Sequence, residues 1–173
     1  MKDQQVTGNI GLYYACFQLS RMGWNAMPTA RNARGVDIIA YNRDCSRMIS
    51  IQVKTLSRKN PVPLGTSLDR LMGDFWIIVN DVVKEPKSYI MLPQEVKDLA
   101  HRGEKDGRVS FWLQPSAYCI DDFHEAWDRI GKPNNSRLVR YRICSGSLLN
   151  RFVRRSSIRR LANWPICSGS VLS

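Results

Sequence analysis

Apolar residues near the amino terminus recur at the spacing of one face of a helix. The residues that carry this period are Ile10, Tyr13, Tyr14 and Phe17. Thr7 is a candidate N-cap before them, because a hydroxyl at that position can accept a hydrogen bond from a free backbone N–H. Gly23 is predicted to end the helix, since glycine tolerates the left-handed conformation found just after helices.

The next pattern is that of two neighbouring strands. Residues 36–41 are almost continuously apolar and are interrupted by Asp37, whereas residues 48–56 alternate between apolar and polar. This alternation puts two sets of side chains on opposite faces of the second strand: Ile49, Ile51 and Val53 against Ser50, Gln52 and Lys54. The short polar linker at 42–47 predicts that the two strands form an antiparallel hairpin.

Beyond this hairpin, the pattern predicts a loop at 57–73 and then further strands and helices. These elements are strands at 75–79, 89–92 and 109–113, a helix from Pro93 to about His101, and a last helix from an N-cap at Asp121 to Gly131. Together with the first helix and the hairpin, they predict an α/β fold in which helices flank a mixed β-sheet.

Charge divides the chain into two parts. The net charge is +11, but residues 133–173 contain eight arginines and no acidic residue. Residues 1–132 hold the other 18 basic residues and all 15 acidic ones, which leaves a net charge of +3. We therefore expect a folded domain at 1–132 and a basic extension at 133–173. A charge of +3 permits phosphate binding by the domain without demonstrating it.

The basic extension contains a short internal repeat. Residues 143–148 read ICSGSL and residues 166–171 read ICSGSV. Two copies are too few for a stacked-repeat fold, which needs about three or more. The extension also lacks a sustained helical or strand period, which favours a poorly ordered appendage such as a read-through or frame-shifted sequence. A basic arm that binds nucleic acid is the alternative interpretation.

The cysteines and the hydrophobic runs indicate where the protein resides. Five cysteines are widely scattered and form no Cys-x-x-Cys pair, so neither a zinc cluster nor a disulfide framework is expected. An odd number of thiols fits a reducing compartment. The start of the sequence has no signal-peptide stretch, and no run approaches the roughly 20 apolar residues needed to cross a bilayer. We expect a cytoplasmic protein with no membrane segment.

The side chains most suggestive of chemistry are Asp37, Gln52 and Lys54. Asp37 lies at the start of one hairpin strand, while Gln52 and Lys54 lie two residues apart on one face of the next, so the hairpin brings all three to one end of the sheet. A carboxylate and an amide oxygen can hold a divalent cation. A lysine ammonium can orient water or neutralise charge on a phosphate. The set predicts a metal-and-phosphate site.

This arrangement resembles the PD-(D/E)XK nuclease superfamily, in the variant whose second acidic residue is glutamine, as in some resolvase-like and restriction-type members. The resemblance runs over residues 7–55 and rests on Gly35-Val36-Asp37 followed by Gln52-Val53-Lys54. The segments at 74–79 and 89–93 are similar to the strands that complete the core of small bacterial members.

The resemblance implies a restriction-endonuclease-like fold and a Mg²⁺- or Mn²⁺-dependent endonuclease acting on DNA. It implies Asp37 and Gln52 as metal ligands, with Lys54 as the third catalytic residue. Small nucleases of this fold often pair to cut two strands, so a homodimer is expected by analogy.

One departure from the family pattern leaves other functions open. Many relatives carry a glutamate on the first helix, but no acidic residue lies between Asp3 and Asp37 here, and Gln52 is neutral. A domain that has lost catalysis and binds nucleic acid as a scaffold or regulatory subunit is therefore a second hypothesis. A protein-interaction domain without a nucleic-acid role is a third. The residues themselves also have a purely structural interpretation, in which Asp37 hydrogen-bonds a turn at a strand start and Ser50, Gln52 and Lys54 lie on the solvent-exposed face of an edge strand.

Polar and basic residues flank the candidate site on both sides. Those predicted to contact a DNA backbone are Arg31, Asn32 and Arg34 before Asp37, and Arg58 and Lys59 after the second strand. Solvated loop positions are an equally good interpretation of these residues.

Overall fold

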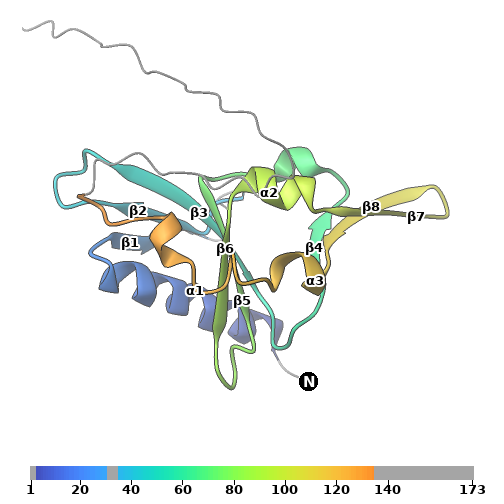
Figure 1. Ribbon diagram of the computed structural model, residues 1–173, viewed down its shortest axis with the longest axis horizontal. Helices are drawn as coiled ribbons and strands as arrows, with labels where there is room; N and C mark the ends of the chain where they lie inside the picture. The colour runs from blue at the N-terminus through green and yellow to red at the C-terminus, as the bar shows by residue number, and fades with distance from the viewer. Residues whose placement is uncertain (1–2, 31–34, 135–173) are drawn as a thin grey trace, which may run out of the picture. The chain divides into compact units, whose positions relative to one another are not determined.

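The computed structural model describes residues 3–30 and 35–134. The basic extension predicted for 133–173 lies outside these ranges except for its first two residues. In chain order, the elements are α1 (Gln4–Arg21), β1 (Asn25–Pro28), β2 (Ile38–Tyr41), β3 (Met48–Thr55), β4 (Val62–Gly65), η1 (Leu68–Arg70), β5 (Phe75–Asn80), β6 (Lys87–Met91), α2 (Pro93–Asp98), β7 (His101–Lys105), β8 (Arg108–Leu113), α3 (Pro115–Tyr118) and η2 (Trp127–Arg129) (Figure 1).

The strands form a main sheet in the order β1-β2-β3-β5-β6 and a smaller sheet in the order β4-β8-β7. The main sheet is mixed, because β3 pairs with β2 in the antiparallel sense and with β5 in the parallel sense. The predicted hairpin of β2 and β3 is confirmed, with Ile38 opposite Ile51. The α/β class with a mixed sheet is likewise confirmed.

Each face of the main sheet has its own apolar core. The core shared with α1 includes Ala15, Leu19, Ile38, Ala40, Ile51, Ile77, Val79 and Ile90. The core on the opposite face, shared with the smaller sheet and α2, includes Val62, Trp76, Ile78, Met91, Val96, Leu113, Tyr118 and Phe123. Because alternate residues of β3 point to opposite faces, Ile51 and Val53 pack toward α1, and Gln52 and Lys54 lie on the other face.

The first helix differs from its prediction in its start and in its buried face. Asp3 rather than Thr7 is the N-cap, and its carboxylate accepts a hydrogen bond from the N–H of Gln5 at 2.9 Å. The helix buries Gly11, Ala15 and Leu19, whereas Tyr13 and Phe17 from the predicted face are more than half exposed. Gly11 decides this orientation, since a Cβ there would overlap the side chain of Thr55 on β3. Gly23 ends the helix region as predicted, with φ +97°.

Three predictions for the second half of the chain are wrong. Residues 57–73 were predicted as a loop but contain β4, and the end of the predicted helix at His101 is the start of β7. The first is a strand because it pairs with β8, about fifty residues further along the chain. The second is a strand because it forms a hairpin with β8 through the tight turn at Asp106 and Gly107. The helix predicted from Asp121 to Gly131 is absent; the segment forms turns and η2.

The segment after α3 does not form a helix because it bonds to the edge of the main sheet. The carbonyl of Phe123 accepts a hydrogen bond from the N–H of Ile90 at 2.9 Å. Glu125, at φ +47°, donates its N–H to the carbonyl of Ser88 at 2.8 Å and accepts the N–H and hydroxyl of Ser88 with its carboxylate. These bonds cover part of the open edge of β6, which would otherwise present unpaired backbone groups.

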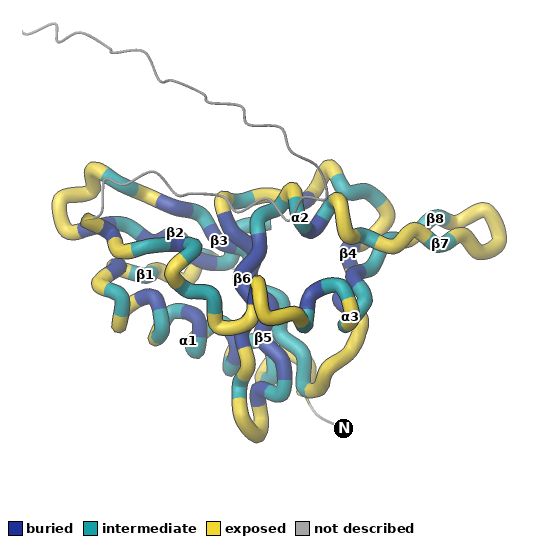
Figure 2. Tube along the Cα trace, viewed as in Figure 1, coloured by how far each residue is buried: buried dark blue, intermediate teal, exposed yellow. Residues whose placement is uncertain are grey.

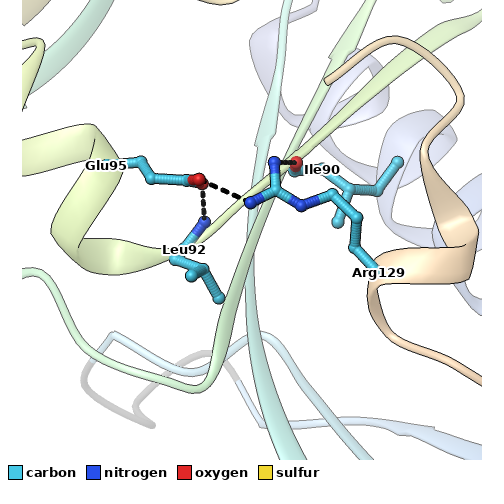
Figure 3. A network of polar contacts seen from close by, with 4 residues as sticks. All are labelled: Ile90, Leu92, Glu95 and Arg129. Atoms are coloured by element: carbon cyan, nitrogen blue, oxygen red, sulfur yellow. Dashed lines mark hydrogen bonds and ion pairs between the residues drawn. The ribbon is translucent and has the colours of Figure 1, made fainter. Parts of the chain in front are cut away.

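A polar network fastens the same segment to α2 (Figure 3). The guanidinium of Arg129 bonds the carboxylate of Glu95 at 2.5 Å and the carbonyl of Ile90 at 3.1 Å. The other carboxylate oxygen of Glu95 accepts the N–H of Leu92 at 2.8 Å and so caps α2. Both charged side chains are only 17% exposed, so the pair ties η2, β6 and α2 together. Within the described ranges, no helix is long and apolar enough to cross a membrane.

Candidate active site

Asp37 is the residue immediately before β2, and it is bonded to β3 through both backbone and side chain. Its N–H donates to the carbonyl of Ile51 at 2.9 Å. Its carboxylate Oδ2 accepts the N–H of Val53 at 2.7 Å. Pairing of β2 with β3 ends at Ile38 and Ile51, so the carboxylate takes the place of a backbone acceptor for Val53. Because Val53 lies between Gln52 and Lys54, the aspartate is held directly beside both.

Gln52 contributes an amide oxygen that has no partner. Its Oε1 is buried and accepts no hydrogen bond from the described residues. On β3 it lies next to Trp76 of β5, on the face opposite α1. Leaving a buried acceptor unsatisfied costs about 1–3 kcal/mol, and native proteins rarely keep such groups without a functional reason. The oxygen is therefore available as a ligand for a hydrogen-bond donor or a cation.

Lys54 is half-buried on the same face, and its ammonium is oriented by an aromatic ring. Its Nζ lies 5.6 Å from the ring centroid of Trp76. The ring is itself held by a 3.2 Å hydrogen bond from the indole N–H to the carbonyl of Met72. In the described part of the chain, Lys54 makes no ion pair. The positive charge is thus directed by a cation–π contact and is not neutralised by a carboxylate.

Two loops meet beside these residues. Gly35, at φ +71°, lies against Met72, and a Cβ built on the glycine would be 3.1 Å from the methionine sulfur. The loop that carries Asp37 into β2 therefore contacts the loop that leads into β5. Gly35 is needed for this contact because its backbone conformation is one that other residues adopt at a cost. The contact holds Asp37 at the β3 side of the loop.

Asp74 is a second carboxylate at this end of the sheet, and it was not among the predicted site residues. Its Oδ2 accepts the N–H of Ser50 at 2.8 Å and the hydroxyl of Ser50 at 2.9 Å, while its own N–H donates to the Ser50 carbonyl at 2.7 Å. Strand alternation puts Asp74 on the face of Trp76, and Ser50 on the face of Gln52. No local signal marks Asp74, since its nearness to Ser50 depends on the β3–β5 pairing.

The structure leaves the predicted nucleic-acid contacts as predictions. Arg31, Asn32 and Arg34 lie outside the described residues. Arg58 and Lys59 are exposed in the segment between β3 and β4. In the described ranges no three His, Cys, Asp or Glu side chains converge on a metal site. The described α1 also has no acidic residue in its first turn.

Comparison with known proteins places the fold. No family model matches the chain, and no curated protein matches it. Its structure is similar to that of the bacterial homing endonuclease I-Ssp6803I, with a TM-score of 0.52 and 18% sequence identity over 75% of this chain and 93% of that one. It is also similar to Hjc, a Holliday junction resolvase from the archaeal hyperthermophile Archaeoglobus fulgidus, with a TM-score of 0.44 and 20% identity over 65% of this chain and 87% of that one. At such identities a likeness establishes the fold alone.

Proposed function

Because the chain has a restriction-endonuclease-like nuclease fold, we propose that it hydrolyses phosphodiester bonds in DNA with the help of Mg²⁺ or Mn²⁺. The observation that carries this proposal is the buried, unbonded amide oxygen of Gln52. It lies one residue from the amide that the Asp37 carboxylate bonds and two residues from the ammonium of Lys54. A buried acceptor of this kind can coordinate a cation or accept a hydrogen bond from a ligand.

The oxygens present fit a hard divalent cation. Asp37 uses Oδ2 for the N–H of Val53, and its Oδ1 makes no hydrogen bond with the described residues. Gln52 adds a neutral oxygen, and Mg²⁺ is commonly held by one or two carboxylates, with water and substrate phosphate completing its shell. When bound, such a cation polarises a phosphate and lowers the pKa of a water molecule. We assign Asp37 and Gln52 as its protein ligands.

Lys54 supplies the positive charge of the site. Its ammonium, directed by Trp76, is suited to neutralise charge that develops on a phosphate or to orient the attacking water. Lysine fits this role because its ammonium is a compact charge with three rotatable donors. Since no carboxylate pairs with it in the described ranges, the charge is available to a polyanionic substrate.

Asp74 adds the negative charge that α1 lacks. We assign it as a positioning residue, because its Oδ2 holds the backbone and hydroxyl of Ser50, two residues from Gln52. This bond fixes the stretch of β3 that carries the ligand oxygen. Asp74 is exposed, its Oδ1 makes no hydrogen bond with the described residues, and its charge raises the local preference for a cation.

The direct test is cleavage of plasmid and branched DNA in Mg²⁺ or Mn²⁺, together with calorimetric titration of Mn²⁺. We expect metal-dependent cleavage by the wild type, and a loss of at least about 100-fold for Lys54→Ala, typical of a lost electrostatic group. Asp37→Asn is expected to lose both cleavage and Mn²⁺ binding, whereas Asp74→Asn, which keeps an acceptor for Ser50, is expected to weaken both partially. Equal background cleavage by the wild type and Lys54→Ala would overturn the enzymatic proposal.

A domain that binds nucleic acid without cutting it is the second candidate, and the absence of an acidic residue anywhere in α1 favours it. The calorimetric titration of Mn²⁺ distinguishes this DNA-binding scaffold from the proposed nuclease. Salt-dependent DNA binding that persists in Asp37→Asn, with no Mn²⁺ heat in the wild type, supports the scaffold. A homodimer remains an expectation by analogy, which sedimentation of the DNA complex tests, and a cytoplasmic location remains a prediction from the sequence.

A further inference from the structure

The hairpin of β7 and β8 is a two-stranded ribbon built to hold its shape. Its turn consists of Asp106 and Gly107, both at positive φ (51° and 71°), which is the type I′ geometry that matches the twist of such ribbons. Within the described ranges β7 pairs with β8 alone, so the other edge of β7 is open. Figure 1 shows the ribbon projecting from the rest of the described domain, and Figure 2 shows its tip exposed.

The two faces of the ribbon differ in charge. The register pairs His101 with Trp112, Gly103 with Ser110 and Lys105 with Arg108. By strand alternation these six residues share one face, which we call the basic ribbon face: His101, Gly103, Lys105, Arg108, Ser110 and Trp112. This face has two cations at its tip and no acidic side chain. The opposite face carries Arg102 and Glu104, which pair with each other at 2.8 Å and cancel.

An aromatic side chain braces the basic ribbon face. The ring of Trp112 lies directly over Gly103, where a Cβ would overlap the ring. The imidazole of His101 packs against the same ring, with centroids 4.6 Å apart. Because the ring lies along the ribbon and not outward from it, its role is to stiffen the base. The cations at the tip are therefore presented on a rigid support.

The charges at the tip have no partner within the described part of the chain. Lys105 and Arg108 lie opposite one another, are exposed and make no ion pair there. Asp106, in the turn beside them, and Glu104, held by Arg102, are the neighbouring acidic groups. The face thus keeps two unneutralised cations on adjacent strands, about 5 Å apart at the backbone.

We propose that the basic ribbon face binds the phosphates of double-stranded DNA beside a groove. The major groove, about 12 Å wide, admits a two-stranded ribbon, and unpaired Lys and Arg are the side chains that displace counterions from phosphates. Ser110, on the same face, adds a hydroxyl of the kind that bonds phosphate oxygens. The choice of DNA as the ligand rests on the proposed function, whereas the binding itself needs neither a metal nor catalysis.

The test is fluorescence anisotropy of the full chain on a labelled DNA duplex in EDTA, with salt varied between about 50 and 200 mM. The test variant is Lys105→Gln/Arg108→Gln. A charge-matched control is Lys84→Gln/Lys87→Gln on the β5–β6 hairpin, which removes the same two charges from exposed positions elsewhere. The basic extension contributes equally to every variant, so the differences between variants isolate the ribbon.

For the ribbon variant we expect about tenfold weaker binding and a salt slope smaller by about two, since each phosphate contact contributes about 0.9 to the slope. The control is expected to retain the wild-type slope. Equal salt slopes for the ribbon variant and the control would overturn the proposal. It would also be overturned if the ribbon variant lost affinity for a single-stranded DNA probe but not for the duplex. The binding is measured in EDTA, where metal-dependent cleavage does not occur, so a failure of the nuclease proposal in cleavage assays leaves this result readable by itself.

Discussion

Replacing Gln52 by methionine removes the unpaired amide oxygen and keeps the length and volume of the side chain. The wild type bears the cost of a buried acceptor without a donor, about 1–3 kcal/mol, and the thioether carries no such cost. Losing the solvated amide nitrogen and repacking the thioether against the face of Trp76 offset part of this gain. We therefore expect Gln52→Met to raise the free energy of unfolding by about 1 kcal/mol in EDTA.

Adding a metal should reverse the order of the two proteins. Mn²⁺ at about 100 times its dissociation constant stabilises a binding protein by about 2.7 kcal/mol, because only the folded state binds it. Gln52→Met lacks one proposed ligand and should gain much less. The variant is expected to be the more stable protein without metal and the less stable one with it. Residues of functional sites often lower the stability of the folded protein, so replacing them commonly raises stability and removes function.

Urea unfolding followed by tryptophan fluorescence, with EDTA or with Mn²⁺, measures both free energies. Gln5→Met, at an exposed position of α1, is the matched control and should stay within about 0.5 kcal/mol of the wild type in both conditions. A Gln52→Met protein destabilised by more than about 1 kcal/mol in EDTA would mean that the oxygen already has a partner in solution. The reasoning that makes Gln52 a ligand would then be refuted.

Two further predictions concern stability. Glu95→Ala leaves Arg129 largely buried without its carboxylate partner, so we expect the free energy of unfolding to fall by about 2 kcal/mol, less than for a fully buried pair. The double variant Glu95→Ala/Arg129→Met should recover part of this loss, as measured by thermal unfolding. Burial raises the pKa of the Tyr118 phenol well above its usual value, because the folded protein disfavours the phenolate. The contribution of the neutral phenol to stability is therefore complete below about pH 10 and is lost as the pH rises further. Urea unfolding between about pH 8 and 11 should show this decline, and Tyr118→Phe should reduce it; burial also raises the pKa of the Tyr89 phenol, which accounts for a further part.

The sequence alone was sufficient to predict the hairpin that holds the candidate site. The alternation along β3 separates Gln52 and Lys54 from the apolar residues beside them, and the side-chain period of a strand is a local property. The short linker before β3 is also a local feature, and it predicts antiparallel pairing of β2 with β3. Whether Asp37, Gln52 and Lys54 carry out catalysis remains a prediction. The structure adds the hydrogen bond from Val53 and the unpaired amide oxygen, neither of which a pattern of residue types reveals.

The orientation of α1 could not be read from its pattern. Its sequence has apolar residues on two sides, and of the predicted stripe Ile10 and Tyr14 pack against the core while Tyr13 and Phe17 are exposed. The small residues Gly11 and Ala15 face the sheet instead, because the helix approaches Thr55 closely enough to exclude a Cβ. A hydrophobicity pattern ranks faces by the size of their side chains, whereas packing also depends on how near the partner backbone comes.

Local patterning determined the central hairpin, the α/β class and the three predicted site residues. Tertiary structure alone decided that β4 joins the β7–β8 hairpin in a second sheet, that residues 121–131 cover the edge of β6, and that Asp74 bonds Ser50. Each of these rests on partners distant in the chain, and strands take their stability from such partners more than from their own residues. The periods along the chain specify which face a residue occupies, and only the assembled sheets specify what lies opposite it.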